Sequence, residues 1–309
     1  GWYLGRGSND NKAGLTGILI ALQYLNAQGF QPTRDLIILF TGDEETTGNG
    51  ARRAATEWRS LIDAEYGLNS DAGGGSIYKD GRVELFAMQI AEKTYADYKL
   101  TATNRGGHSS APRPDNAIYA LSNALNALEA HRFPAMVNDA TRAGFSLLAE
   151  KDGGQYGELI KRFLADPNDK EAADLVEAND PGSTRTRCVA TMLSGGHAPN
   201  ALPQKAEANV NCRIFPGVKV EEVRQQLQAL AGPDVTVTAV EGSQTPETAP
   251  TPIRQDVLDA YKAAVATRFK DAPVVPYQSA GATDGAFLRA NGIPVYGFGG
   301  LWGIVGERE

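Results

Sequence analysis

Residues 36–45 read Leu36-Ile37-Ile38-Leu39-Phe40-Thr41-Gly42-Asp43-Glu44-Glu45. The five apolar residues have the length and composition of a parallel strand that is buried on both faces. Ligands of open parallel sheets bind at the carboxyl ends of the strands. We therefore expect Asp43, Glu44 and Glu45 at the ligand-binding edge of such a sheet.

The sequence on both sides of this stretch alternates between helix and strand patterns. Apolar residues at helical spacing predict an amphipathic helix over residues 13–28, with Gly29 as its C-cap. A second helix is expected over residues 50–62 and a short strand over residues 66–70. Helices that alternate with buried strands are typical of an α/β layer with a parallel sheet.

The pattern changes near Tyr95. Strands and helices then follow in the order β-α-β-β-α-β, at residues 96–103, 115–130, 187–193, 205–215, 220–230 and 235–240. This is the order of a ferredoxin-like α+β domain. The polar, helix-prone residues 138–181 are expected to form an insertion within it.

The last part of the chain returns to the α/β pattern. Residues 244–250 have the composition of a linker, and a helix over residues 256–269 and a strand over residues 295–298 follow. The simplest interpretation is a small domain inserted into a larger one. We expect the larger domain at residues 1–93 and 247–309 and the smaller domain at residues 94–246.

Acidic residues stand at three predicted element ends. Asp71 follows the strand over residues 66–70, and Asp10 precedes the first helix, so both join Glu44 and Glu45 at one edge of the sheet. Carboxylates that converge repel each other unless a cation compensates, which suggests one or two divalent metals. Each group alone also fits a simpler role: an N-cap for Asp10, a solvated loop for the triplet and a turn for Asp71.

The composition excludes several classes of protein. The 309 residues carry a net charge of −7, which argues against a nucleic-acid partner because nucleic acids select basic surfaces. No run of about 18 apolar residues is present, so no membrane-spanning helix is expected. The two cysteines, Cys188 and Cys212, are too few for a disulfide scaffold. They are equally distant from Asn200 and can face each other across a hairpin, but we expect free, packed thiols.

The chain begins at Gly1 rather than at Met and stops at Glu309 without a closing helix. We interpret it as a fragment. Any signal peptide would be lost with the true N-terminus of such a fragment, so the sequence predicts no cellular location.

Three segments resemble a known family in content and order. They are Gly5-Arg6-Gly7-Ser8-Asn9-Asp10-Asn11-Lys12-Ala13-Gly14, Thr41-Gly42-Asp43-Glu44-Glu45 and Gly106-Gly107-His108-Ser109-Ser110-Ala111-Pro112. They are similar to segments of the dinuclear zinc metallopeptidases and amidohydrolases that include acetylornithine deacetylase, succinyl-diaminopimelate desuccinylase, glutamate carboxypeptidase and aminoacylase. The resemblance covers essentially the whole chain. It implies an α/β metal-binding domain and a ferredoxin-like lid and dimerisation domain.

The resemblance assigns roles to four acids. It implies that Asp10 bridges two zinc ions, that Glu45 binds one and Asp71 the other, and that Glu44 is the general base. Two zinc ions lower the pKa of a water and polarise the scissile carbonyl. A carboxylate beside them can then carry the proton to the leaving amine. Cobalt or manganese would suit the same ligands.

The resemblance also assigns roles outside the acidic edge. His108 would stabilise the oxyanion in the active site of a partner subunit, which makes the functional unit a homodimer formed through the small domain. Asn200, Arg213 and the loop around Thr283 would contact the substrate, and the guanidinium fork of Arg213 suits a carboxylate. Taken alone, His108 equally fits a loop histidine and Arg213 a surface charge at a strand end.

The sequence departs from the family in its histidines. The family uses two histidine ligands, one ahead of the first segment and one near the C-terminus. Neither can be found among His108, His131 and His197. Zinc sites normally have three or more protein ligands. We therefore expect the 309-residue chain alone to bind zinc weakly and to be inactive.

The expected function is metal-dependent hydrolysis of a peptide or N-acyl amide bond next to a carboxylate, as in a carboxypeptidase, a dipeptidase or an N-acyl amino acid deacylase. The substrate would be a small peptide or an N-acyl amino acid. One alternative is a non-catalytic binding or assembly module that kept the fold. Glu44 argues against it, because a decayed site has no reason to keep its base. A mononuclear aminopeptidase of related fold is a second alternative, and the inserted domain argues against it.

Overall fold

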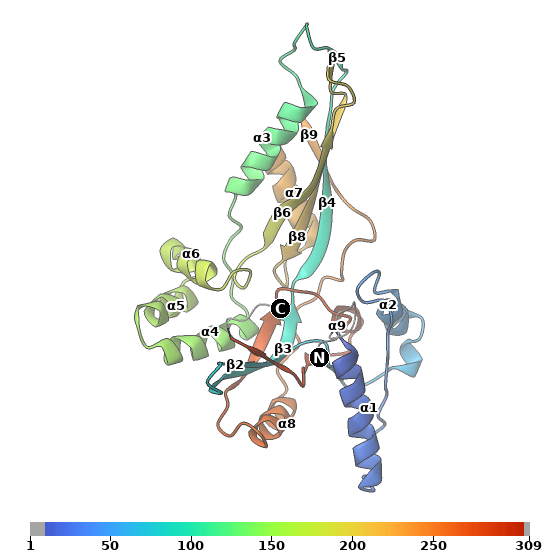
Figure 1. Ribbon diagram of the computed structural model, residues 1–309, viewed down its shortest axis with the longest axis vertical. Coiled ribbons are helices and arrows are strands. Elements are labelled where there is room, and N and C mark those ends of the chain that lie inside the picture. The colour runs from blue at the N-terminus through green and yellow to red at the C-terminus, as the bar shows by residue number, and fades with distance from the viewer. Residues whose placement is uncertain (1–9, 306–309) are drawn as a thin grey trace.

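Two main β-sheets organise the chain in the computed structural model, which describes residues 10–305 (Figure 1). The large sheet has the order β1-β11-β3-β2-β12, and β10 also pairs with β3. Its strands are β1 Gly67–Asn69, β2 Gly74–Ile77, β3 Val83–Glu92, β10 Val274–Ser279, β11 Val295–Gly297 and β12 Trp302–Ile304. The pairs β1–β11, β10–β3 and β12–β2 are parallel, whereas β2 and β11 run antiparallel to β3.

Strand β3 is the centre of the large sheet and was not predicted. Its last seven residues are all buried, including Met88 and Ile90. They pack with Tyr296 of β11 and with Val257 and Leu258 of helix α8 (Gln255–Ala266). The strand carries the acid Glu92 and the amide Gln89 within its apolar run, so the sequence pattern of a buried strand is interrupted.

The small sheet has the order β6-β8-β4-β9, and every neighbouring pair is antiparallel. Its elements are β4 Thr94–Thr103, α3 Ala117–Ala130, β6 Arg187–Gly195, β8 Lys205–Ile214, α7 Val220–Ala231 and β9 Val235–Ala239. Alternate residues of β4 and β8 are buried, as expected for a sheet that is covered on one face. That face packs against α3 and α7 through Leu121, Val223 and Leu227. The ferredoxin-like order predicted from the sequence is confirmed.

Residues 138–181 form the predicted insertion, which contains α4 Asp139–Asp152, α5 Gln155–Ala165 and α6 Lys170–Asn179. The three helices share a core that includes Phe145, Phe163 and Val176. Asn138 caps α4 by accepting the Thr141 N–H at 3.0 Å. Helix α4 packs on β10 of the large sheet, although the insertion joins two elements of the small one (Figure 1). The insertion therefore contacts the large sheet directly.

The N-terminal part of the described chain corrects one expectation. Helix α1 (Lys12–Ala27) forms as predicted, and Gly29 after it has a positive φ of 69°. Residues 36–40 are not the predicted buried strand: they are extended without a strand partner in the described part of the chain, and their side chains are 38 to 52% exposed. A strand exists only with a neighbour that takes its backbone hydrogen bonds, and an apolar run cannot supply that neighbour.

The remaining helices are short. Helix α2 (Asn49–Thr56) and a 3₁₀ turn at Arg59–Leu61 occupy the range predicted as one helix, and α9 (Gly285–Ala290) precedes β11. None of the helices within residues 10–305 combines the length and the apolarity needed to cross a membrane.

The domain limits at residues 93/94 and 246/247 stay a prediction.

The two cysteines form a disulfide, so the expectation of free thiols was wrong. Cys188 of β6 lies directly opposite Cys212 of β8 in the antiparallel register, with a Cα–Cα separation of 4.1 Å. The equal distance of the two cysteines from Asn200 in the sequence had correctly indicated that they can face each other across the hairpin. Composition alone could not reveal its oxidation state.

We expect reduction of the disulfide to destabilise the small sheet by about 3 kcal/mol, because the bond closes a loop of 24 residues. Urea unfolding with and without a thiol reductant measures the change. A Cys188→Ser/Cys212→Ser variant is the control and should be indifferent to the reductant. Equal stability of the native chain in both conditions would contradict the prediction.

Candidate active site

One residue of the acidic triplet has a structural role. The Asp43 carboxylate accepts the backbone N–H groups of Asn49 at 2.7 Å and Gly50 at 3.0 Å, and the Thr47 hydroxyl at 2.7 Å. These bonds hold the pKa of Asp43 below its usual value and secure the first turn of α2. Asp43 is thus occupied at a helix start, whereas Glu44 is partly buried and Glu45 exposed.

Asp71 and Asp10 meet at the end of β1. Asp71 accepts a hydrogen bond of 3.0 Å from the Asn11 side-chain amide, and its backbone N–H donates to Asn69 Oδ1 at 2.9 Å. Burial, followed by the charge of Asp10 and a hydrogen bond with the Asp10 carboxyl, raises the pKa of Asp71 to about 6. Two carboxyl groups in contact share a proton when no cation is present.

Glu44 faces this pair. Burial, followed by the charges of Asp71, Asp284, Glu45 and Asp10 in that order of effect, raises its pKa to about 7. The structure therefore brings together all four acids that the sequence assigned to a metal centre.

Asp284 is a fifth acid at this edge, to which the sequence analysis gave no role. Its Oδ2 accepts the Thr41 hydroxyl, and its Oδ1 is buried without a hydrogen-bond partner in the described chain. Burial raises its pKa. Its position directly after Thr283, in a loop expected near the substrate, was the one feature of the sequence that could have identified Asp284 as a site residue.

The donor set suits a hard divalent cation. All five groups are carboxylates, one oxygen among them has no partner, and Glu44 and Asp71 have pKa values raised by burial and then by the neighbouring carboxylates. In the range 10–305 no three His, Cys, Asp or Glu side chains are already spaced as a finished metal site. Asp10, Glu45 and Asp71 thus fit as part of a ligand set.

His108 and Asn200 lie together, but far from the acids. Strands β5 (Gly107–His108) and β7 (Ala201–Leu202) form a small ribbon, and the Ser109 N–H donates to the Asn200 carbonyl at 3.0 Å. Both side chains are exposed. The ribbon caps the end of the small sheet opposite to α1 and α2 (Figure 1). The structure therefore does not bring His108 to the acidic edge of its own chain.

Thr283 and Arg213 lie nearer the junction of the two sheets. The buried Thr283 hydroxyl donates to Glu92 at 2.8 Å and accepts from Asn69 Nδ2 at 3.1 Å, so it connects β3 and β1. The Arg213 guanidinium stacks over the Tyr95 ring at 4.8 Å from its centre. Only Arg213 of these two keeps donor groups available for a ligand.

Lys93, between β3 and β4, is fully buried at this junction and donates to the Arg185 carbonyl. Burial is the main cause that lowers its pKa to about 8, and nearby arginines contribute to this lowering against an opposing effect of Glu177. The unfolded chain keeps this proton up to about pH 10. The unfolded state therefore binds more protons between about pH 8 and pH 10, so folding stability should rise with pH there, by up to about 3 kcal/mol.

Urea unfolding across that window measures the rise, and Lys93→Met should remove it. Tyrosines with raised pKa values act in the opposite direction at higher pH, so the comparison with the variant isolates Lys93. The same pH slope in the variant would contradict the assignment.

Comparisons with known proteins identify the family and the fold. The model of peptidase family M20/M25/M40 matches residues 1–308. The solved structure of an M20 family metallo-carboxypeptidase, Sso-CP2 from Sulfolobus solfataricus, superposes with a TM-score of 0.63 over 95% of this chain and 68% of that one, at 20% identity. Human carnosine dipeptidase 1 gives a TM-score of 0.58 over 96% of this chain and 66% of that one, at 14% identity.

Similar sequences have hydrolase names. The N-fatty-acyl-amino acid synthase/hydrolase PM20D1 of Bos taurus is 31% identical over 245 residues, 76% of this chain and 47% of that protein. Carboxypeptidase S of Saccharomyces cerevisiae is 29% identical over 232 residues, 71% of this chain and 40% of that protein. The chain spans about half the length of these curated relatives. The family match over nearly the whole chain and the two-sheet fold confirm the resemblance seen in the sequence: the chain belongs to the M20/M25/M40 peptidase family.

Proposed function

We propose that the protein hydrolyses a peptide or N-acyl amide bond next to a carboxylate, with Glu44 as the general base. The observation that supports this most is the convergence of the partly buried Glu44 with Asp10, Asp71 and Asp284, since burial and these neighbouring charges together raise the Glu44 pKa to about 7. A general base is most effective when its pKa lies near the working pH. A binding module has no use for a carboxylate with that property.

Asp10, Glu45 and Asp71 would hold the metal ions, of which two zinc ions suit the family best. Bound there, the ions would supply an acidified water and polarise the scissile carbonyl. Glu44 accepts a proton at its carboxylate and delivers it to the leaving nitrogen. Asp43 keeps the loop in place by capping α2, so that Glu44 and Glu45 are presented from a fixed backbone.

The substrate would enter between the two sheets. Arg213 would bind its carboxylate, and Asn200 and His108, at the far ribbon, would act on a partner subunit. Exposed Val189, Met192 and Leu193 on the edge strand β6 support a homodimer that forms through the small sheet, because an edge strand with exposed apolar residues invites pairing. N-acyl amino acids and small peptides with a free carboxylate are the substrates that this arrangement suits.

The test is metal content and hydrolysis in the longest natural protein that contains this chain. We expect about two zinc ions per subunit and turnover of N-acyl amino acids or dipeptides. Asp10→Asn should weaken metal binding by at least about tenfold, since even a residue behind a ligand contributes that much. Asp35→Asn, which removes an exposed charge elsewhere, is the matched control. A metal-free, inactive protein would favour the binding-module alternative.

A further inference from the structure

Three side chains stand in one row across the small sheet, on the face that α3 and α7 leave open. Tyr95 of β4 is directly opposite Arg213 of β8, and Arg213 is directly opposite Arg187 of β6. The next residues along the strands, Cys188 and Cys212, join the buried side of the sheet. Because side chains alternate between faces, both guanidinium groups rise from the open face.

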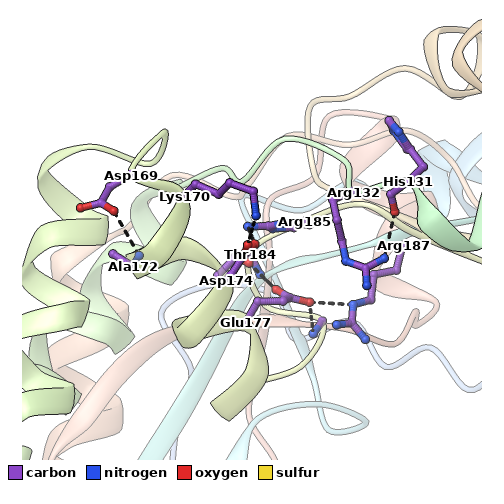
Figure 2. Close-up of polar contacts among 11 residues, drawn as sticks. His131, Arg132, Asp169, Lys170, Ala172, Asp174, Glu177, Thr184, Arg185 and Arg187 are labelled. Atoms are coloured by element: carbon purple, nitrogen blue, oxygen red, sulfur yellow. Dashed lines mark hydrogen bonds and ion pairs between the residues drawn. The ribbon is translucent and has the colours of Figure 1, made fainter.

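Arg187 is held by the insertion. Its Nε donates to Glu177 Oε1 of α6 at 2.6 Å (Figure 2). Glu177 is 6% exposed and is itself fixed by the Gly182 N–H at 2.9 Å, by the Thr184 N–H at 3.2 Å and by the Thr184 hydroxyl. The Arg187 side chain remains about half exposed, at 53%. The Nε contact therefore orients the guanidinium and leaves its two terminal nitrogens available.

The row carries more positive than negative charge. Like charges directly opposite in a sheet destabilise it, and Lys93 adds a third cation close enough for both arginines to lower its pKa. The negative charges here are Glu177, which is ion-paired with Arg187, and Asp180, which also acts on Lys93. Arg213 has its stacking contact with Tyr95 and no ion pair within the described residues. An anionic ligand would relieve this repulsion.

We propose that Arg187 is a specificity residue, and that Arg213 and Arg187 together bind the two carboxylates of an amino-dicarboxylic leaving group, of the aspartate or glutamate type. This rests on the proposed function. Arg213 binds the carboxylate next to the scissile bond, and Arg187 binds the side-chain carboxylate. Glu177 is a positioning residue that acts only through Arg187. The insertion thus contributes to substrate choice through one buried acid.

The experiment compares N-acetylglutamate with N-acetylglutamine, which differ by one charge at constant shape, in the longest natural protein that contains this chain. We expect kcat/KM to favour N-acetylglutamate by at least about tenfold, as a charge-assisted bidentate contact allows. Arg187→Gln should abolish that preference by lowering kcat/KM for N-acetylglutamate much more than kcat/KM for N-acetylglutamine. Arg132→Gln, which removes an arginine bonded only to carbonyl groups, is the matched control and should keep the preference.

Calorimetry with free glutamate and glutamine provides a readout that does not need turnover. Selective glutamate binding that Arg187→Gln removes supports the inference, even if neither substrate is hydrolysed and the proposed function fails. Glu177→Gln should reduce the preference in KM and leave kcat for N-acetylglutamine unaltered. The inference would be overturned if Arg187→Gln lowered kcat/KM equally for N-acetylglutamate and N-acetylglutamine, or if the native protein bound glutamate and glutamine equally well.

Discussion

Replacement of Glu44 by Gln should lower the rate of amide hydrolysis by about 10² to 10⁴-fold, the usual contribution of a general base. The amide has the shape of the carboxylate but cannot take a proton. Because Glu44 is not one of the proposed ligands, zinc content should stay at the native level. Steady-state kinetics and metal analysis of the same preparation measure both quantities.

The matched control is Glu222→Gln, an identical change at an exposed position in the first turn of α7. It should leave hydrolysis and metal content unaltered. Loss of metal together with activity in Glu44→Gln would move Glu44 from base to ligand. Undiminished hydrolysis would remove it from the mechanism altogether.

The second large effect concerns stability. Arg289 of α9 and Glu92 of β3 form an ion pair in which the side chains are 3% and 2% exposed. Arg289→Met would leave the Glu92 charge buried without its partner, and removal of one member of a buried pair costs about 3 to 5 kcal/mol. Burial already raises the pKa of Glu92, so the variant should take up a proton there. Urea unfolding measures the loss.

Two variants make this result specific. Arg82→Met removes an arginine from an exposed pair with Asp80 and should leave the free energy of unfolding nearly unchanged, because water screens exposed ion pairs. Glu92→Gln combined with Arg289→Met should recover part of the stability, because no buried charge then remains. A double variant as unstable as the sum of the single ones would show that the pair contributes by packing rather than by charge.

The small domain could be predicted from the sequence almost element by element. In β4 and β8 one face is covered by helices and the other is open, so burial alternates with a period of two that the sequence displays. The large sheet was harder. Strand β3 is buried but contains Gln89 and Glu92, and residues 36–40 have a strand pattern without a strand partner. Pairing is a property of two segments, and one segment cannot show it.

The acidic edge was predicted because its residues follow element ends, and the topology of an α/β layer brings such ends together. Asp284 was missed because its loop was assigned through Thr283, whose hydroxyl is engaged inside the protein. Arg187 was missed for another reason. The role proposed for Arg187 depends on its strand register with Arg213 and on its ion pair with Glu177 of the insertion. Both contacts join segments that are distant in the sequence, so neither can be seen before the chain is folded.

The insertion makes contact with both sheets at once: α4 lies on β10, and Glu177 of α6 holds Arg187 at the start of β6. It therefore bridges the junction of the two sheets beside the buried Lys93. If the small sheet rotated against the large one, α6 would have to bend or the Glu177 contact would have to break. The insertion, like the chain segments that connect the two sheets, would therefore limit the angle of any closing motion. Insertions of different length at this position would therefore allow different angles of opening between the two sheets, while the large sheet and its acidic edge stay the same.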